Sequence, residues 1–215
     1  MSKRCRTAIL ISGSGTNLQA FIDAIADGEI DLEIVVVFSN NPDAYGLQRA
    51  AAAGIPTACI RHDAFADRES FDAAVIAELD GFAPDLLVLA GFMRILGPAF
   101  VAHYRGKILN IHPALLPLYP GLNTHQRVID AGDEWHGSTV HFVTEQLDAG
   151  PRILQGRLRV NADENANELQ DRVQSLEHKI FPRAANMVGN GDVTFIDGQC
   201  WVNGAPREEP EIETF

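Results

Sequence analysis

The hydrophobic positions of residues 1–111 follow two alternating patterns. Nearly continuous apolar runs, each with the length of a buried strand, cover residues 7–12, 33–39, 57–60, 85–91 and 107–111. The segments between them carry apolar side chains at helical spacing, over residues 17–28, 44–54, 69–79 and 97–106. Buried strands that alternate with amphipathic helices predict an α/β fold, with a mainly parallel, twisted sheet and helices on both faces.

Beyond residue 121 the alternation changes. The pattern predicts a helix over 124–133, strands over 138–143 and 152–160, and a long helix over 167–191. Pro182 predicts a kink or break in that last helix. Residues 193–204 predict a C-terminal hairpin, because Asp197-Gly198 suits a type I′ turn. No long linker interrupts residues 1–204, so we expect one domain with a mononucleotide-binding half over 1–105 and a second half over 106–204.

Composition favours a soluble protein of the cytoplasm. Hydrophobic residues make up 46% of the 215, enough for a core without disulfides. The longest apolar run, 86–93, is far shorter than the roughly 20 residues that span a bilayer. The apolar stretch near the start, 8–11, is also too short for a signal peptide. Cys5, Cys59 and Cys200 form no C-x-x-C pair, which argues against a disulfide framework or a structural zinc site.

The formal net charge of −12 argues against a nucleic-acid partner, since no basic patch is available to neutralise phosphates. Four glutamates crowd the end of the chain, so residues 205–215 predict a solvated, disordered acidic tail. An anionic small substrate would therefore have to be held by local donors.

A glycine-rich turn lies in ISGSGTNLQA, residues 11–20, between the first strand and the first helix. Such a turn directs backbone N–H groups and the helix dipole at a bound anion. The segment matches neither G-x-G-x-x-G nor a P-loop, which would need a lysine. The alternative is an ordinary tight turn with Thr16 or Asn17 as the helix N-cap.

Asn110 and His112 stand two positions apart at the end of a predicted parallel strand, so their side chains share one face. Open α/β sheets bind their ligands at that end of the strands. Pro113, Pro117 and Pro120 would stiffen the following loop. The amide and the imidazole could bind a substrate, although a histidine at a strand end can equally be structural.

Asp148 precedes Ala-Gly-Pro in a predicted turn. Its carboxylate, if it lay beside an imidazole, would favour the imidazolium form. The alternative is a turn-forming aspartate that binds its own backbone. His136 and His141 are five apart without a suitably spaced third ligand, so we expect no metal site.

Several segments together resemble the phosphoribosylglycinamide formyltransferases, a family of folate-dependent enzymes of purine biosynthesis. They include ISGSGTNLQA (11–20), PDLLVLAGFMRIL (84–96), ILNIHPALLPLYPG (108–121), LDAGPRILQ (147–155) and RVQSLEHKIFP (172–182). The similarity covers nearly the whole chain. It implies formyl transfer from 10-formyltetrahydrofolate to phosphoribosylglycinamide, with no metal.

The resemblance also implies roles for single residues. The catalytic set would be Asn110, His112 and Asp148. The ribonucleotide would contact Gly15, Thr16, Asn17, Leu18, Gln19, Gln174 and Glu177. The folate would contact Arg68, Met93, Arg94, Ile95, Leu96, Asn110, Thr144, Glu145, Gln146, Leu147 and Asp148. The chain departs from the family pattern at Ser14, Leu118 and Asn123.

Direct attack of the glycinamide amine on the formyl carbon would form a tetrahedral intermediate, with Asn110 and imidazolium His112 as its stabilising groups. One alternative is formyltetrahydrofolate hydrolase, which carries an additional N-terminal domain. Another is methionyl-tRNA formyltransferase, which carries an additional C-terminal domain. A nucleotide-binding module without catalysis is a third. We expect small-molecule partners, no membrane, and a monomer or a homodimer.

Overall fold

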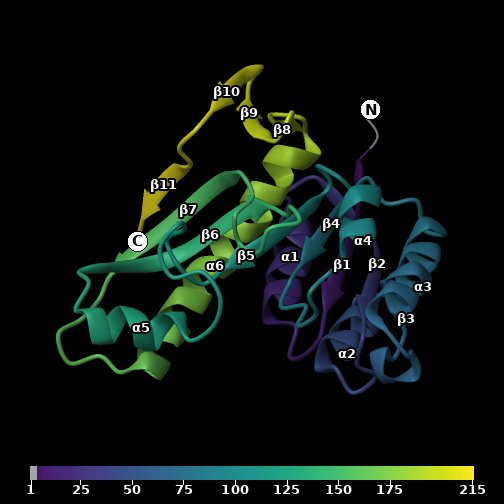
Figure 1. Ribbon diagram of the computed structural model, residues 1–215, viewed down its shortest axis with the longest axis horizontal. Helices are drawn as coiled ribbons and strands as arrows, with labels where there is room; N and C mark the ends of the chain where they lie inside the picture. The colour runs from purple at the N-terminus through teal and green to yellow at the C-terminus, as the bar shows by residue number, and fades with distance from the viewer. Residues whose placement is uncertain (1–3) are drawn as a thin grey trace.

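Eight strands form the central sheet of the computed structural model, which describes residues 4–215 (Figure 1). In chain order they are β1 (Cys5–Ile11), β2 (Leu32–Ser39), β3 (Thr57–Cys59), β4 (Leu86–Leu89), β5 (Ile108–His112), β6 (Trp135–Phe142), β7 (Arg152–Arg159) and β11 (Glu211–Thr214). In space the order is β11-β7-β6-β5-β4-β1-β2-β3. Neighbours from β5 to β3 pair in parallel, whereas β6 is antiparallel to both β5 and β7. The prediction of a mainly parallel sheet is confirmed.

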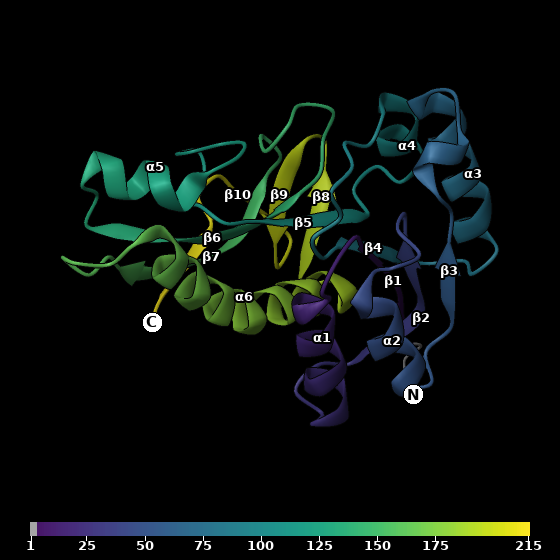
Figure 2. The same ribbon diagram turned by 90° about the horizontal axis from the view of Figure 1, so that it is seen from below.

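Helices cover both faces of this sheet (Figure 2). One core cluster contains side chains from α1 (Thr16–Ala26), α2 (Tyr45–Ala52), α5 (Thr124–Ala131) and α6 (Ala166–Gly189). The other contains side chains from α3 (Arg68–Asp80) and α4 (Pro98–His103). Along β1, successive residues alternate between the two clusters, as the pleat of a strand requires. The short 3-10 helix η1 (His62–Ala64) precedes α3.

Helix α6 continues through Pro182 to Gly189, so the predicted break is wrong. Asn165 and Glu168 form a capping box at its start, which satisfies the first free N–H groups. Near Pro182, the helix buries Phe181 against Phe21 of α1, with ring centroids 5.3 Å apart. This burial stabilises the helix on both sides of the proline and offsets the lost backbone hydrogen bond.

The C-terminal hairpin is confirmed. Strands β8 (Val193–Ile196) and β9 (Gln199–Val202) pair antiparallel around Asp197 and Gly198. Both turn residues have positive φ, 50° and 82°, as a type I′ turn requires. A third strand, β10 (Ala205–Arg207), pairs with β9.

The predicted disordered tail is wrong. Residues 211–214 form β11, which pairs in parallel with β7 at the edge of the main sheet. Arg183 of α6 forms ion pairs with Glu211, at 2.8 Å, and with Glu213. Arg183 therefore neutralises part of the negative charge of the tail. Composition alone, which cannot show this partner, had predicted a solvated end. Among residues 4–215, no helix is both long enough and apolar enough to cross a bilayer.

Removal of residues 208–215 should lower the free energy of unfolding by about 1–3 kcal/mol, because β7 loses its edge partner and Arg183 loses both carboxylates. Urea titration of the full-length and shortened proteins measures the difference. As a control, Glu208→Ala at an exposed position of the same segment should change stability by less than about 0.5 kcal/mol. Equal stability of the full-length and shortened proteins would contradict a structural role for β11.

Candidate active site

The end of β5 places Asn110 and His112 on one face of the strand, with Ile111 between them on the other. Strand β5 lies between β4 and β6, and Asn110 is the register partner of Leu89 on one side and of His141 on the other. The two polar side chains therefore project from an interior strand of the sheet. An interior strand holds their backbone in a single position.

Both ring nitrogens of His112 face oxygen atoms. Nδ1 lies 3.5 Å from Oδ2 of Asp148, and Nε2 lies 2.9 Å from the carbonyl oxygen of Tyr119. The side chain is only 6% exposed. Since a carbonyl oxygen can only accept, Nε2 carries a proton, and Nδ1 faces the carboxylate. The ring of His112 is therefore held between a carbonyl oxygen and a carboxylate.

Asp148 belongs to the loop that follows β6 and returns to the end of β5. Its Oδ2 accepts a hydrogen bond from the backbone N–H of Gly121 at 2.9 Å, and its side chain is 7% exposed. Its φ of 51° shows that it does shape a turn. The carboxylate nevertheless binds the backbone of the proline loop, not its own backbone as the alternative expected. The structure therefore brings Asp148 to His112, an arrangement that the local sequence had left open.

The amide of Asn110 is oriented by His141, a residue that the sequence offered only as a poor metal ligand. Nδ1 of His141 lies 2.9 Å from the carbonyl oxygen of Phe142, so Nδ1 carries the proton. Burial lowers the pKa of His141, which keeps the ring neutral and leaves Nε2 as an acceptor. Nδ2 of Asn110 donates to it at 3.2 Å. The orientation of the amide follows, with one N–H directed away from His141.

The loop after His112 is held by buried side chains as well as by its prolines. The hydroxyl of Thr139, fully buried, donates to the carbonyl of Ala114 at 2.7 Å and accepts from the N–H of Leu116 at 3.0 Å. Gln155 donates to the same hydroxyl and to the carbonyl of Leu116. The prolines alone had been expected to stiffen this loop. Thr139 and Gln155 were missed because their partners are distant in sequence.

The glycine turn ends at Gly15, which is the N-cap of α1 with φ 70°. A Cβ at Gly15 would lie 2.6 Å from Cα of Gly46, so both the backbone angle and the packing require glycine there. The alternative, a helix cap by Thr16 or Asn17, is therefore wrong. Among the residues that the structure describes, no side chain caps this helix, so its first N–H groups are available to an anion.

Four of the predicted ribonucleotide residues meet where α1 packs on α6. Nε2 of Gln174 donates to Oγ1 of Thr16 at 3.1 Å, and Nδ2 of Asn17 donates to Oε2 of Glu177 at 3.1 Å. The side chain of Leu18 is fully buried in the core, so only its backbone could contact a ligand.

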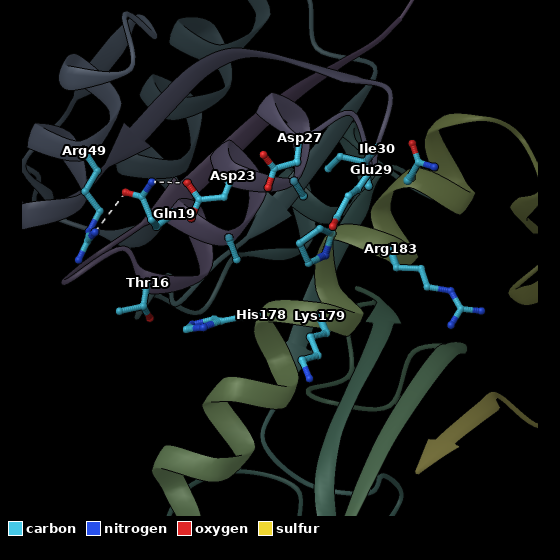
Figure 3. Close-up of a pocket in the computed structure, with 14 residues that line it drawn as sticks. Thr16, Gln19, Asp23, Asp27, Glu29, Ile30, Arg49, His178, Lys179 and Arg183 are labelled. Carbon is cyan, nitrogen blue, oxygen red and sulfur yellow. Dashed lines mark hydrogen bonds between the residues drawn. The ribbon is translucent and has the colours of Figure 1, made fainter. Parts of the chain in front are cut away.

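A cavity of about 590 Å³ opens beside these residues between α1 and α6 (Figure 3). Thr16 and Gln19 line the end near the glycine turn, where Nη1 of Arg49 donates to Oε1 of Gln19 at 3.1 Å. Lys179 and His178 of α6 line the opposite wall. Nε of Arg49 also donates to the carbonyl oxygen of Ser14 at 2.9 Å, so this cation lies beside the glycine turn.

The predicted folate residues lie on exposed segments beside β5. Met93 and Ile95 are 76% and 64% exposed. Their segment is anchored at both ends, because Ser12 accepts from the N–H of Met93 at 2.8 Å and Asp72 accepts from the N–H of Gly97 at 2.7 Å. Burial raises the pKa of Asp72, and the nearby cations Arg68 and Arg94 oppose this rise. Residues 144–147 form the loop that leads to Asp148, and Leu147 is 60% exposed.

Two further histidines, His125 and His136, lie near His112. Nε2 of His136 lies 3.0 Å from Nδ1 of His125, so one of these nitrogens donates its N–H to the other. Burial, reinforced by His125, lowers the pKa of His136 to about 3. Within residues 4–215, no three side chains of the histidine, cysteine or carboxylate type are grouped so that they could hold a metal ion.

Residues 5–185 match the family described as Formyl transferase. The chain is 50% identical over 196 residues to phosphoribosylglycinamide formyltransferase of Escherichia coli (strain K12), covering 91% of this chain and 92% of that protein. It is 44% identical over 199 residues to the Haemophilus influenzae (strain ATCC 51907 / DSM 11121 / KW20 / Rd) protein of the same name, covering 93% and 94%. The solved phosphoribosylglycinamide formyltransferase of Coxiella burnetii superposes with a TM-score of 0.94 at 45% identity, covering 98% of this chain and 100% of that one.

The chain therefore belongs to the formyl transferase family, and within it to the phosphoribosylglycinamide formyltransferases. Members are enzymes of purine biosynthesis, and their co-substrate is 10-formyltetrahydrofolate.

Loss of His141 should affect turnover through Asn110. His141→Leu removes the acceptor that orients the amide, so we expect turnover to fall roughly ten- to hundredfold. His141→Gln, whose side-chain oxygen can accept from Asn110, should retain more activity than the leucine variant. Steady-state rates of the two variants, with circular dichroism to check folding, measure the difference. Equal activities would show that the acceptor does not matter.

His136 should make the folded protein less stable in acid. The unfolded chain takes up a proton on this ring near its ordinary pKa of 6.5, whereas the folded protein does so only near 3. The free energy of unfolding should therefore rise with pH across this window and fall as the pH is lowered. His136→Gln should remove that part of the slope. Urea titrations at several pH values test this, and parallel curves for the two proteins would contradict it.

Proposed function

We propose that the chain transfers the formyl group from N10 of 10-formyltetrahydrofolate directly to the amine of phosphoribosylglycinamide. The observation that carries the proposal is the meeting of Asn110, His112 and Asp148 at the end of β5. A neutral donor, a cationic donor and a carboxylate at one point suit a reaction in which negative charge develops on a carbonyl oxygen.

Asn110 donates to the formyl oxygen as the amine attacks. Within residues 4–215 its amide forms one hydrogen bond, to His141, which leaves the second N–H available. Because His141 holds the amide before the substrate arrives, little reorganisation is needed when the oxyanion forms.

His112 stabilises the tetrahedral intermediate as an imidazolium and protonates the leaving nitrogen of the folate. In the structure its Nε2 proton is directed to the carbonyl of Tyr119, and Nδ1 faces Asp148. Proton transfer to the folate therefore requires the ring to exchange the Tyr119 bond for the substrate. Asp148 supports the charged ring before and after that exchange.

The two substrates would bind to different segments at the carboxyl ends of the strands. We assign the ribonucleotide phosphate to the free N–H groups of α1, with Thr16, Gln19 and Arg49 beside it. These residues belong to the predicted mononucleotide-binding half, 1–105. We assign the folate to the exposed segments 93–96 and 144–148, with Arg68 beside Asp72.

An assay of the purified protein with 10-formyltetrahydrofolate, with and without phosphoribosylglycinamide, tests the proposed reaction. We expect loss of the formyl group only when the ribonucleotide is present, with formylated ribonucleotide as the product. Release of formate without the ribonucleotide would instead indicate a hydrolase.

Asp148→Asn should lower turnover near neutral pH by about a hundredfold or more, because the charge that supports imidazolium His112 is lost. Asparagine tolerates the positive φ of this position, so the turn itself should persist. Asp197→Asn is a matched control, since Asp197 also has a positive φ, 50°, but lies in the hairpin turn. Steady-state rates of the two variants provide the test. If both retained normal turnover, Asp148 would be only a turn former.

A further inference from the structure

A buried row of polar groups connects the start of α1 with the backbone of His112. Nδ2 of Asn17 lies 3.1 Å from Oε2 of Glu177, and Oε1 of Glu177 lies 2.9 Å from Oγ of Ser138. The same Ser138 oxygen lies 2.7 Å from the carbonyl oxygen of His112. The row thus crosses from α1 through α6 and β6 to β5.

The protons in this row can be counted. Ser138 has one hydroxyl hydrogen but two oxygen neighbours within hydrogen-bond distance. The carbonyl of His112 can only accept, and an ionised Glu177 can also only accept. One of the two oxygen–oxygen contacts would then lack a proton and bring lone pairs together. A protonated Glu177 supplies the missing hydrogen.

The surroundings favour the neutral acid as well. Ser138 is fully buried, and Glu177 and Asn17 are each 8% exposed. Burial raises the pKa of Glu177, and the hydrogen bonds from Asn17 and Ser138 oppose this effect only in part. A neutral carboxyl group also satisfies every contact of the row, because its carbonyl oxygen accepts from Asn17 while its hydroxyl donates to Ser138.

We propose that Glu177 is held as a neutral carboxylic acid and is a positioning residue, whose O–H donates to Ser138 while Ser138 donates to the carbonyl of His112. The inference rests on the proposed function, in which His112 acts on the transferred formyl group and Asn17 lies at the ribonucleotide end. The row joins these two ends of the site through hydrogen bonds of fixed direction. The resemblance implied that Glu177 contacts the ribonucleotide. The proposal adds that Glu177 holds the backbone of His112 in position through Ser138.

Infrared spectroscopy of the substrate-free protein with ¹³C-labelled glutamate carboxyl groups tests the protonation. A carbonyl stretch of a protonated carboxyl group should be present at neutral pH and absent in Glu177→Gln. Should that variant fail to fold, Asn17→Ala should shift the same band, because it removes the donor to the carbonyl oxygen. The absence of any protonated-carboxyl band that depends on Glu177 or Asn17 would overturn the proposal. The measurement needs no turnover, so it separates this inference from the proposed function.

Ser138→Ala tests the positioning role. The variant should lower kcat about tenfold, as expected for one lost hydrogen bond, while KM for each substrate changes less than about threefold. Ser39→Ala is the matched control, because Ser39 is also a fully buried strand serine but lies outside the row. Its kcat should stay within about twofold of the wild type. Similar kcat values for Ser138→Ala and Ser39→Ala would overturn the positioning role. Absence of formyl transfer in the wild type would overturn the proposed function instead, with the infrared result unaffected.

Discussion

The antiparallel pairing of β5 with β6 is the interaction on which the site depends. Its register sets His141 opposite Asn110 and Thr139 opposite His112. Residues directly opposite one another in an antiparallel pair have neighbouring side chains. One register therefore places both His141, which orients Asn110, and Thr139, which holds the proline loop. A shift of one residue would turn all of them to the other face of the sheet.

The same region buries several polar side chains. His136, His141, Thr139, Gln155 and Glu177 are all buried, and each has a hydrogen-bond partner. A buried polar group without a partner destabilises the fold by more than one hydrogen bond stabilises it. Each of these side chains must therefore keep the geometry that its hydrogen bond requires. That constraint gives the end of β5 the rigidity that oriented donors require. The ring of His112 is different, since the proposed proton transfer would require it to release Tyr119.

Much of the fold could be predicted because its signals are local. Apolar runs and helical periods indicated the order of strands and helices in the first half, and Asp197-Gly198 indicated the hairpin turn. The failures came where distant contacts outweighed a local preference. Packing against α1 carries α6 through Pro182, Gly15 caps α1 because its backbone must pass Gly46, and Arg183 draws the acidic end into the sheet.

For the site, the sequence by itself determined that Asn110 and His112 share a face at a strand end, since strand geometry alone requires it. It also marked Asp148 as a turn residue, and the resemblance assigned all three to one reaction. Only the tertiary structure decided that the carboxylate of Asp148 reaches His112, that His141 orients Asn110, and that Ser138 and Glu177 connect α6 to β5. Each of these contacts joins residues far apart in the chain, and their distances depend on how the sheet is paired and how α6 packs on it. Local preferences along the chain carry no information about such distances.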